Sequence, residues 1–152
     1  MMNLIKTKFT KVSANVVLLI LFVTVTTISC KEDPPEPTQA EINKGLMATT
    51  WVVSSVTDDT GDVTAAWSGF TLTVTENNYT SSNNVDYPDV WPSNGTWSLD
   101  ANDAFLVKRS DGIDITIHKL DETTLNMEFD YIIPSGRLSS VEGNWKFNMV
   151  AQ

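Results

Sequence analysis

The sequence predicts an all-β domain: an antiparallel, up-and-down barrel of about eight strands, with a short helix before the first strand. Three observations support this fold class. From Trp51 onward apolar and polar residues alternate with a period of two, turn-forming dipeptides separate the alternating runs, and no helical period of useful length lies between them. Strands joined by short turns pair antiparallel, and a sheet of this size avoids free edges best by closing into a barrel. A two-sheet β-sandwich is the alternative fold.

The first 29 residues have the three parts of a secretory signal peptide. The start of the chain is basic through Lys6, Lys8 and Lys11. An unbroken apolar run covers residues 16–23, and small or β-branched residues precede Cys30. This run is short for a transmembrane helix, which needs about 20 apolar residues. We therefore expect cleavage between Ser29 and Cys30; the alternative is a short anchor that is never cleaved.

The residues around the expected cleavage site resemble those of a known class of proteins. Thr27-Ile28-Ser29-Cys30 resembles a lipobox, the processing site of bacterial lipoproteins, in the loose form of Bacteroidetes. The resemblance implies that Cys30 becomes the N-terminus and carries a diacylglyceryl group, and two acyl chains anchor a protein stably where one does not. Lys31, Glu32 and Asp33 follow directly and resemble the signal that exports such lipoproteins to the cell surface. The chain would then be an outer-membrane lipoprotein facing the cell exterior; a plain charged linker is the alternative for these three residues.

Residues 30–37 form the expected linker between the lipidated cysteine and the β domain, which covers residues 38–152. The linker is charged and rich in proline and has no large apolar side chain to bury, so we expect an extended spacer. Thr38 and Glu41 then make a capping-box signature, and Ile42 and Leu46 are four residues apart on one helical face, with Met47 beside them. These residues predict a short helix at about 38–48 that closes one end of the β domain.

The alternating runs define the strands and the residues that face the interior. The clearest runs place apolar residues on one face at Phe70, Leu72, Val74; at Ile113, Ile115, Ile117; at Leu125, Met127, Phe129, Tyr131; and at Val141, Trp145, Phe147, Met149. We expect ten large side chains to point inward: Trp51, Phe70, Leu72, Trp97, Ile115, Leu125, Met127, Phe129, Trp145 and Phe147. If all ten do, little room remains inside, because small eight-stranded barrels can be filled entirely by side chains.

Turn residues separate these runs. Asn94-Gly95 and Asp111-Gly112 are dipeptides suited to tight hairpins, residues 120–125 form a short polar connection, and Pro134-Ser135-Gly136 marks a further turn. Together with the strands, the spacing of Gly and Trp residues resembles that of the lipocalin-like lipoproteins common in Bacteroidetes. The resemblance is carried by Leu46 to Trp51, Gly95-Thr96-Trp97, Thr123-Thr124-Leu125 and Gly143-Asn144-Trp145-Lys146-Phe147. It covers residues 38–152 and implies the barrel fold; ligand binding follows from it only by analogy.

Charge and composition exclude several classes of function. Three of the ten basic side chains and none of the 19 acidic ones lie in residues 1–29, so residues 30–152 carry a formal charge of −12. That sign argues against binding to nucleic acid and against docking on anionic lipid through a basic patch. Cys30 is the only cysteine, which excludes a disulfide within the chain and a thiolate metal cluster.

The sequence shows no set of residues typical of catalysis or of metal binding. His118 is the only histidine and falls on the polar face of a strand, so we expect it to be exposed to solvent. Residues 58–62 cluster carboxylates with the oxygen chemistry of a calcium site but read better as a solvated turn. Glu128 and Asp130 lie on one strand face about 7 Å apart from the strand rise alone, without signs of a cleft. We therefore expect no enzyme, no cofactor and no metal ion.

Four aromatic residues give the candidate ligand site. Trp67, Tyr79, Tyr87 and Trp91 fall in or beside a long segment rich in Ser, Asn and Asp. On loops at the mouth of a barrel they could stack on sugars or cover an apolar ligand; alternatively they plug the open end. The expected function is a surface-anchored binding module for a glycan or an apolar molecule, and the alternative is a structural or accessory lipoprotein with a filled barrel.

Overall fold

The computed structural model describes residues 34–82, 86–132 and 141–152. The chain divides into residues 1–36 and residues 37–152, and the second unit holds all the helices and strands of the described residues in one compact body. The signal peptide, Ser29, Cys30 and the residues from Lys31 to Asp33 lie outside the described residues, so they stay predictions.

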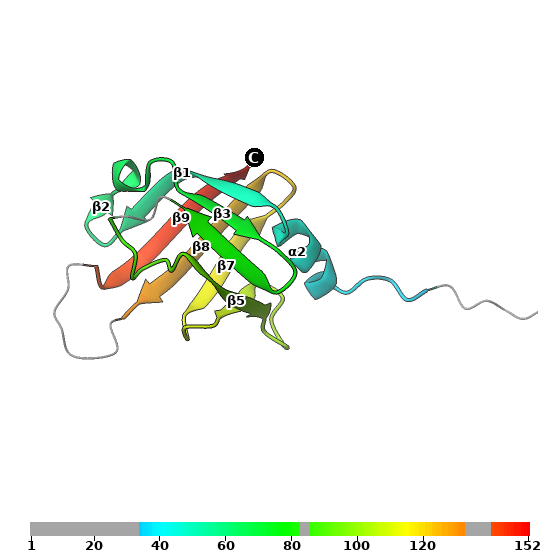
Figure 1. Cartoon of the computed structure of the whole chain (residues 1–152). Helices are drawn as coiled ribbons and strands as arrows, with labels where there is room; N and C mark the ends of the chain where they lie inside the picture. The colour runs from blue at the N-terminus through cyan, green and yellow to red at the C-terminus, as the bar shows by residue number, and fades with distance from the viewer. Residues whose placement is uncertain (1–33, 83–85, 133–140) are drawn as a thin grey trace, which may run out of the picture. The chain divides into compact units, whose positions relative to one another are not determined.

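The strands form one closed antiparallel barrel (Figure 1). Their bounds are β1 Thr50–Asp58, β2 Gly61–Asp62, β3 Thr71–Val74, β4 Asn78–Ser82, β5 Asn94–Leu99, β6 Leu106–Arg109, β7 Asp114–Leu120, β8 Thr124–Tyr131 and β9 Gly143–Ala151. The strand order is β2-β1-β3-β4-β5-β6-β7-β8-β9, and β1 also pairs with β9, which closes the sheet. Eight strands make the barrel, since the two residues of β2 only pair with the last two residues of β1. The predicted up-and-down barrel is confirmed, and the sandwich alternative is wrong.

The helix α2 (Gln39–Met47) begins at the predicted cap. The Thr38 hydroxyl accepts a hydrogen bond from the Glu41 main chain, and the Glu41 carboxylate accepts one from the Thr38 main chain at 2.7 Å. The expected apolar face is right for Met47, which is buried, and wrong for Ile42, which is exposed while the polar Asn43 is buried. Asn43 can be buried since its amide donates to the Ala104 carbonyl at 2.8 Å and accepts from its helical neighbour four residues before it.

Two of the predicted turns are present and one is wrong. Asp111-Gly112 joins β6 to β7 with Gly112 at a φ of 90°, and residues 121–123 join β7 to β8. Asn94-Gly95 is instead the start of β5, where Gly95 pairs with Tyr79 on β4. The glycine is needed there because the Tyr79 ring covers it: a Cβ at position 95 would lie 2.6 Å from the Tyr79 hydroxyl oxygen. Pro134-Ser135-Gly136 lies outside the described residues.

The barrel has two ends with different contents. At the helix end lie α2 and the short connections 75–77, 100–105 and 121–123. At the opposite end, called the far end below, lie connections 59–70, 86–93 and 110–113; the first two are longer than any at the helix end, and the first includes the 3₁₀ helix η1 (Thr64–Trp67). The domain thus begins at one end of the barrel, and the longer connections gather at the other.

The core fills the inside of the barrel. All ten side chains predicted to point inward are buried, and Trp51, Phe70, Leu125 and Phe147 are fully so. Trp51 sits under α2, and its indole donates a hydrogen bond to the Met47 carbonyl at 3.1 Å. The helix therefore covers the helix end as predicted, and the far end must be closed by other groups.

Candidate functional site at the far end of the barrel

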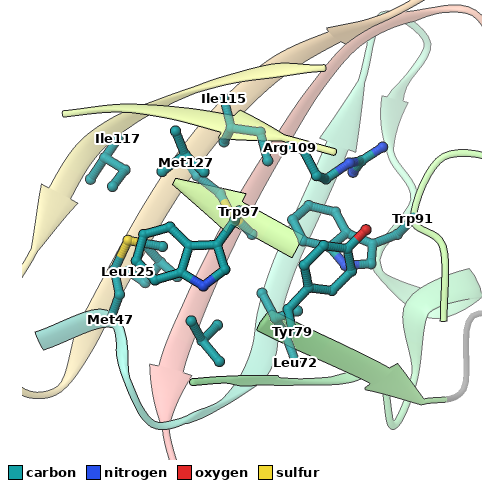
Figure 2. Close-up of a pocket in the computed structure, with 12 residues that line it drawn as sticks. Met47, Leu72, Tyr79, Trp91, Trp97, Arg109, Ile115, Ile117, Leu125 and Met127 are labelled. Atoms are coloured by element: carbon teal, nitrogen blue, oxygen red, sulfur yellow. The ribbon is translucent and has the colours of Figure 1, made fainter. Parts of the chain in front are cut away.

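The interior of the barrel holds almost no free space. One cavity of about 20 Å³ lies among side chains from the strands, from Met47 and from Trp91 (Figure 2). That volume admits roughly one water molecule. Its lining is Met47, Leu72, Val74, Tyr79, Trp91, Trp97, Val107, Arg109, Ile115, Ile117, Leu125 and Met127. A small-molecule ligand does not fit inside the barrel in this conformation.

Aromatic rings close the far end. Trp67, at the last residue of η1, is fully buried and lies at the centre of the group. Its ring stacks on Tyr87 with centroids 5.4 Å apart, and meets Phe147 and Trp145 edge-on at 4.8 Å and 5.7 Å. Phe70 adds a fourth ring at 5.0 Å. Edge-on and stacked pairs at these distances are favourable, so this group forms a packed plug across the end of the barrel.

Residues 86–92, called the strap below, cross the far end between β4 and β5. The main-chain N–H groups of Val90 and Trp91 both donate to the Tyr87 carbonyl, which folds the strap into a tight turn. The turn points Val90 and Trp91 inward, and both are buried. The Trp91 ring lies 5.5 Å from the Phe129 ring and forms part of the cavity wall. A connecting segment, and not a strand, therefore supplies one of the largest side chains of the interior.

Arg109 is the charged residue of this site, and the sequence reasoning missed it. Its side chain is only 1% exposed, although it is a cation at the end of β6. The guanidinium lies over the Trp91 and Phe129 rings, with its central carbon 4.9 Å and 5.4 Å from their centroids. It donates to the Asp111 carboxylate at 2.6 Å and to the Val90 carbonyl at 3.0 Å. Figure 2 shows Arg109 beside the rings of Tyr79 and Trp91 at the edge of the cavity.

One hydrogen-bond donor of Arg109 is unsatisfied within the described part of the chain. Its Nη1 atom is buried and has no hydrogen-bond partner among the residues that the structure describes. Burial of an unpaired charged donor is costly, so such groups are rare and call for an explanation. The faces of the Trp91 and Phe129 rings offset part of this cost through cation–π attraction.

The ion pair changes the acid–base properties of Asp111. Burial alone would raise the pKa of this carboxyl, but the hydrogen bonds and positive charge of Arg109 outweigh burial, so the pKa lies below its ordinary value. Burial also raises the pKa of Tyr79 and of Tyr131, which keeps both phenols neutral at physiological pH. At neutral pH the Asp111 carboxyl is therefore ionised beside the Arg109 guanidinium, and the hydroxyl groups of Tyr79 and Tyr131 are uncharged.

A groove of about 680 Å³ lies on the outer side of this ion pair. It is lined by Pro88, Asp89, Pro92, Asp111, Gly112, Ile113, Asp114, Asp130, Tyr131 and Ile132. The strap forms one wall, the β6–β7 turn another, and the end of β8 the third. This volume lies in the range of small-molecule sites. The strap therefore separates an outer groove from the filled interior.

The four aromatic residues predicted as a ligand site all lie at the far end or next to it. Trp67 is on η1, Tyr87 and Trp91 are on the strap, and Tyr79 is on strand β4, where the sequence reasoning had expected a loop or its edge. Trp67, Tyr79 and Trp91 are buried and Tyr87 is half-buried. In this conformation they fill and close the barrel end, as in the alternative expectation, and a ligand would reach the three buried rings only if the strap moved.

A signal for Arg109 was present in the sequence. Arg109 lies two residues after Val107, so both share the inward face of β6. It also lies two residues before Asp111, which is close enough for an ion pair across the turn. A basic residue at an inward-facing strand position, two residues before a carboxylate, indicates a buried ion pair.

The other polar candidates lie on the outer surface. His118 is half exposed, and its Nε2 lies 2.7 Å from the Glu128 carboxylate, which also faces Lys146 at 3.5 Å. Asp130 accepts a hydrogen bond from the Asn144 amide at 2.9 Å. In residues 58–62 the Asp58 carboxylate accepts from the main chain of the next turn residues, as in a solvated turn. Across the described ranges no group of three or more His, Cys, Asp or Glu side chains is arranged to hold a metal ion.

Comparisons with known proteins give no relative to draw on: no family model, curated protein or solved structure matches this chain. Within residues 34–82, 86–132 and 141–152, no helix has the length and apolar character needed to cross a membrane. The function therefore has to be argued from the residues of the far end and from the N-terminal sequence.

Proposed function

We propose that this chain is a lipid-anchored lipoprotein of the cell envelope whose β domain is a binding module that acts at its far end. The N-terminal sequence ending at Cys30 supports the anchor. The domain begins with α2 at the helix end, and the binding function is placed at the opposite end of the barrel.

The burial of Arg109 with an unsatisfied donor is the main support for a binding function. Transfer of a charge into an apolar interior costs several kcal/mol, and replacement of a buried ion pair by apolar side chains is often neutral or stabilising. A buried guanidinium with a free donor is therefore a poor device for stability. It is a good device for recognition, because it holds a donor ready for a ligand at the end of the barrel.

A structural or accessory lipoprotein without a small-molecule ligand is the second candidate. One observation favours it, namely that the interior cavity has room for about one water molecule. The two candidates differ in whether any small molecule perturbs the far end.

Tryptophan fluorescence tests the binding function, because Trp67, Trp91 and Trp145 all lie at the far end. Residues 37–152 form a compact unit with their own core, so a chain from residue 30 with Cys30→Ser serves for titration with a panel of glycans and lipids. We expect at least one panel member to shift the emission. The shift should weaken in Trp91→Phe and persist in Trp51→Phe, a matched buried tryptophan at the helix end. Silence across the panel favours the structural candidate.

Membrane fractionation tests the anchor separately. The Cys30→Ala variant should leave the membrane fraction, and the mature wild-type protein should show an acylated residue 30 as its N-terminus by mass spectrometry. A variant that stays with the membrane, or an intact Met1 start, would overturn the lipid anchor without touching the argument about the far end.

A further inference from the structure

The strap occupies space that the barrel strands alone would leave open. The cavity walls come from strands β3 to β8, from Met47 and from Trp91. Of these, Trp91 belongs to a connection that enters the barrel from the far end. Its side chain lines the small cavity, while Pro88, Asp89 and Pro92 of the same strap line the outer groove.

Arg109 fastens the strap. Its Nη2 atom donates to the Val90 carbonyl at 3.0 Å, and its guanidinium lies 4.9 Å from the centroid of the Trp91 ring. Asp111 in turn holds Arg109, with the shortest contact at 2.6 Å. The Asp111 side chain is 33% exposed and lines the outer groove, so a groove ligand or solvent can reach it. The strap is therefore held by the ion pair between the buried cation Arg109 and its partly exposed counter-ion Asp111; this pair is called the latch below.

We propose that the strap is a displaceable plug, and that its release opens the interior to an apolar molecule with a single anionic group, which Arg109 binds. The inference rests on the proposed binding function and adds the chemical class of the ligand.

The lining of the cavity sets the apolar part of this ligand. Apart from Arg109 and the hydroxyl group of Tyr79, the side chains around the cavity are aliphatic, aromatic or sulfur-containing. A ligand that replaces the Trp91 indole must bury a similar apolar area, because it can shift the strap only by the difference in its affinity for the two conformations. A polar molecule would leave its hydrogen-bonding groups unpaired there.

Arg109 determines which anionic group the ligand should carry. The free Nη1 donor and the donors released from Val90 and Asp111 match the oxygens of a carboxylate or sulfonate, which a guanidinium binds at two points. Asp111 can turn toward water, since it is one-third exposed. The carboxylates of Asp89 and Asp130 in the groove oppose the approach of an anion. Salt screens such exposed charges more strongly than a buried pair, so binding should tighten as ionic strength rises.

Two dyes with the same aromatic body test the proposal: anilinonaphthalene sulfonate, an anion, and phenylnaphthylamine, which is uncharged. The test uses the chain from residue 30 with Cys30→Ser. In Asp111→Asn the latch is weakened and the cation is kept, so we expect the sulfonate to bind at least about 10-fold more tightly than to the wild type, as one charge-assisted hydrogen bond implies. In Arg109→Met the preference for the sulfonate over the uncharged dye should be lost. Glu76→Gln, which removes an exposed carboxylate paired with Lys44 at 3.6 Å at the helix end, is the matched control and should leave both affinities unchanged.

Hydrogen exchange shows whether the strap alone has moved. Faster exchange confined to the strap in Asp111→Asn supports the plug, and faster exchange throughout the strands overturns it for that variant. In that case Trp91→Ala repeats the test with the ion pair intact, and it should bind the sulfonate in preference to the uncharged dye.

The outcomes separate this inference from the proposed function. Equal gains for both dyes, or a sulfonate preference that survives Arg109→Met, would overturn the anionic class while leaving a binding site at the far end. If neither dye nor any panel ligand perturbs the far-end tryptophans, both the inference and the binding function fail.

Discussion

Replacement of Trp67 by alanine tests whether the far end is a packed plug. Trp67 is fully buried, and four aromatic rings lie within 5.7 Å of its ring centroid. A buried aromatic side chain removes about 150–250 Å² from water, which at about 25 cal/mol per Å² is worth roughly 4–6 kcal/mol. Residual compactness of the unfolded chain lowers such figures by about 10–40%. We therefore expect Trp67→Ala to reduce the free energy of unfolding by about 3–5 kcal/mol, as large-to-small core substitutions do.

Urea unfolding followed by fluorescence measures this change. The midpoint should fall while the slope of the transition stays constant, since the surface exposed on unfolding changes little. Domains of this size have a total stability of about 5–15 kcal/mol, so the loss is a large fraction of it. Phe105→Ala is the control, because Phe105 is a large aromatic side chain that is 42% exposed at the helix end. Its effect should be clearly smaller than that of Trp67→Ala, at about 1–2 kcal/mol, because much of its surface stays in water. A loss below about 1 kcal/mol for Trp67→Ala would refute a far end closed by packing.

Two further predictions concern a pair of glycines and the ion pair. Gly143 has a φ of 143°, and a Cβ there would collide with the Asp59 carboxylate, so Gly143→Ala should destabilise by about 1–3 kcal/mol. Gly45 lies in α2 with open space around its Cα, so Gly45→Ala should stabilise by about 0.5–1 kcal/mol; urea unfolding measures both glycine variants. Because the folded pKa of Asp111 is lowered by Arg109, its stabilisation is complete above the unfolded value near 3.8 and is lost as pH falls through the folded pKa. The stability difference between wild type and Asp111→Asn should thus be largest at neutral pH and vanish in strong acid; a constant difference would refute the pair.

The local pattern of the sequence was sufficient for the architecture. Alternation in runs such as 124–131 and 143–151 assigns each side chain to one face of a strand, and burial of the apolar face then follows from the hydrophobic effect. The capping box at Thr38 is equally local, because the cap and the third residue of the helix are its only participants. For the same reason the Asp111-Gly112 turn was predicted correctly.

Features that depend on distant partners were not predictable in this way. Asn94-Gly95 has the chemistry of a turn, yet both residues pair with β4, and Gly95 leaves room for the Tyr79 ring there. The helix face was misjudged because Asn43 finds a carbonyl acceptor 61 residues later in the chain. The aromatic residues of the candidate site were found by composition, but whether they were open to a ligand or closed as a plug depended on packing.

The sequence by itself determined the strand count, the inward faces and the charge of this protein, because each depends on neighbouring residues or on composition alone. Only the tertiary structure decided that the barrel is full, that the strap turns Trp91 into it, and that Arg109 lies buried against Asp111. These facts depend on how side chains from separate strands and connections share one small interior. The volume left over, and the charge enclosed in it, exist only after the barrel has closed.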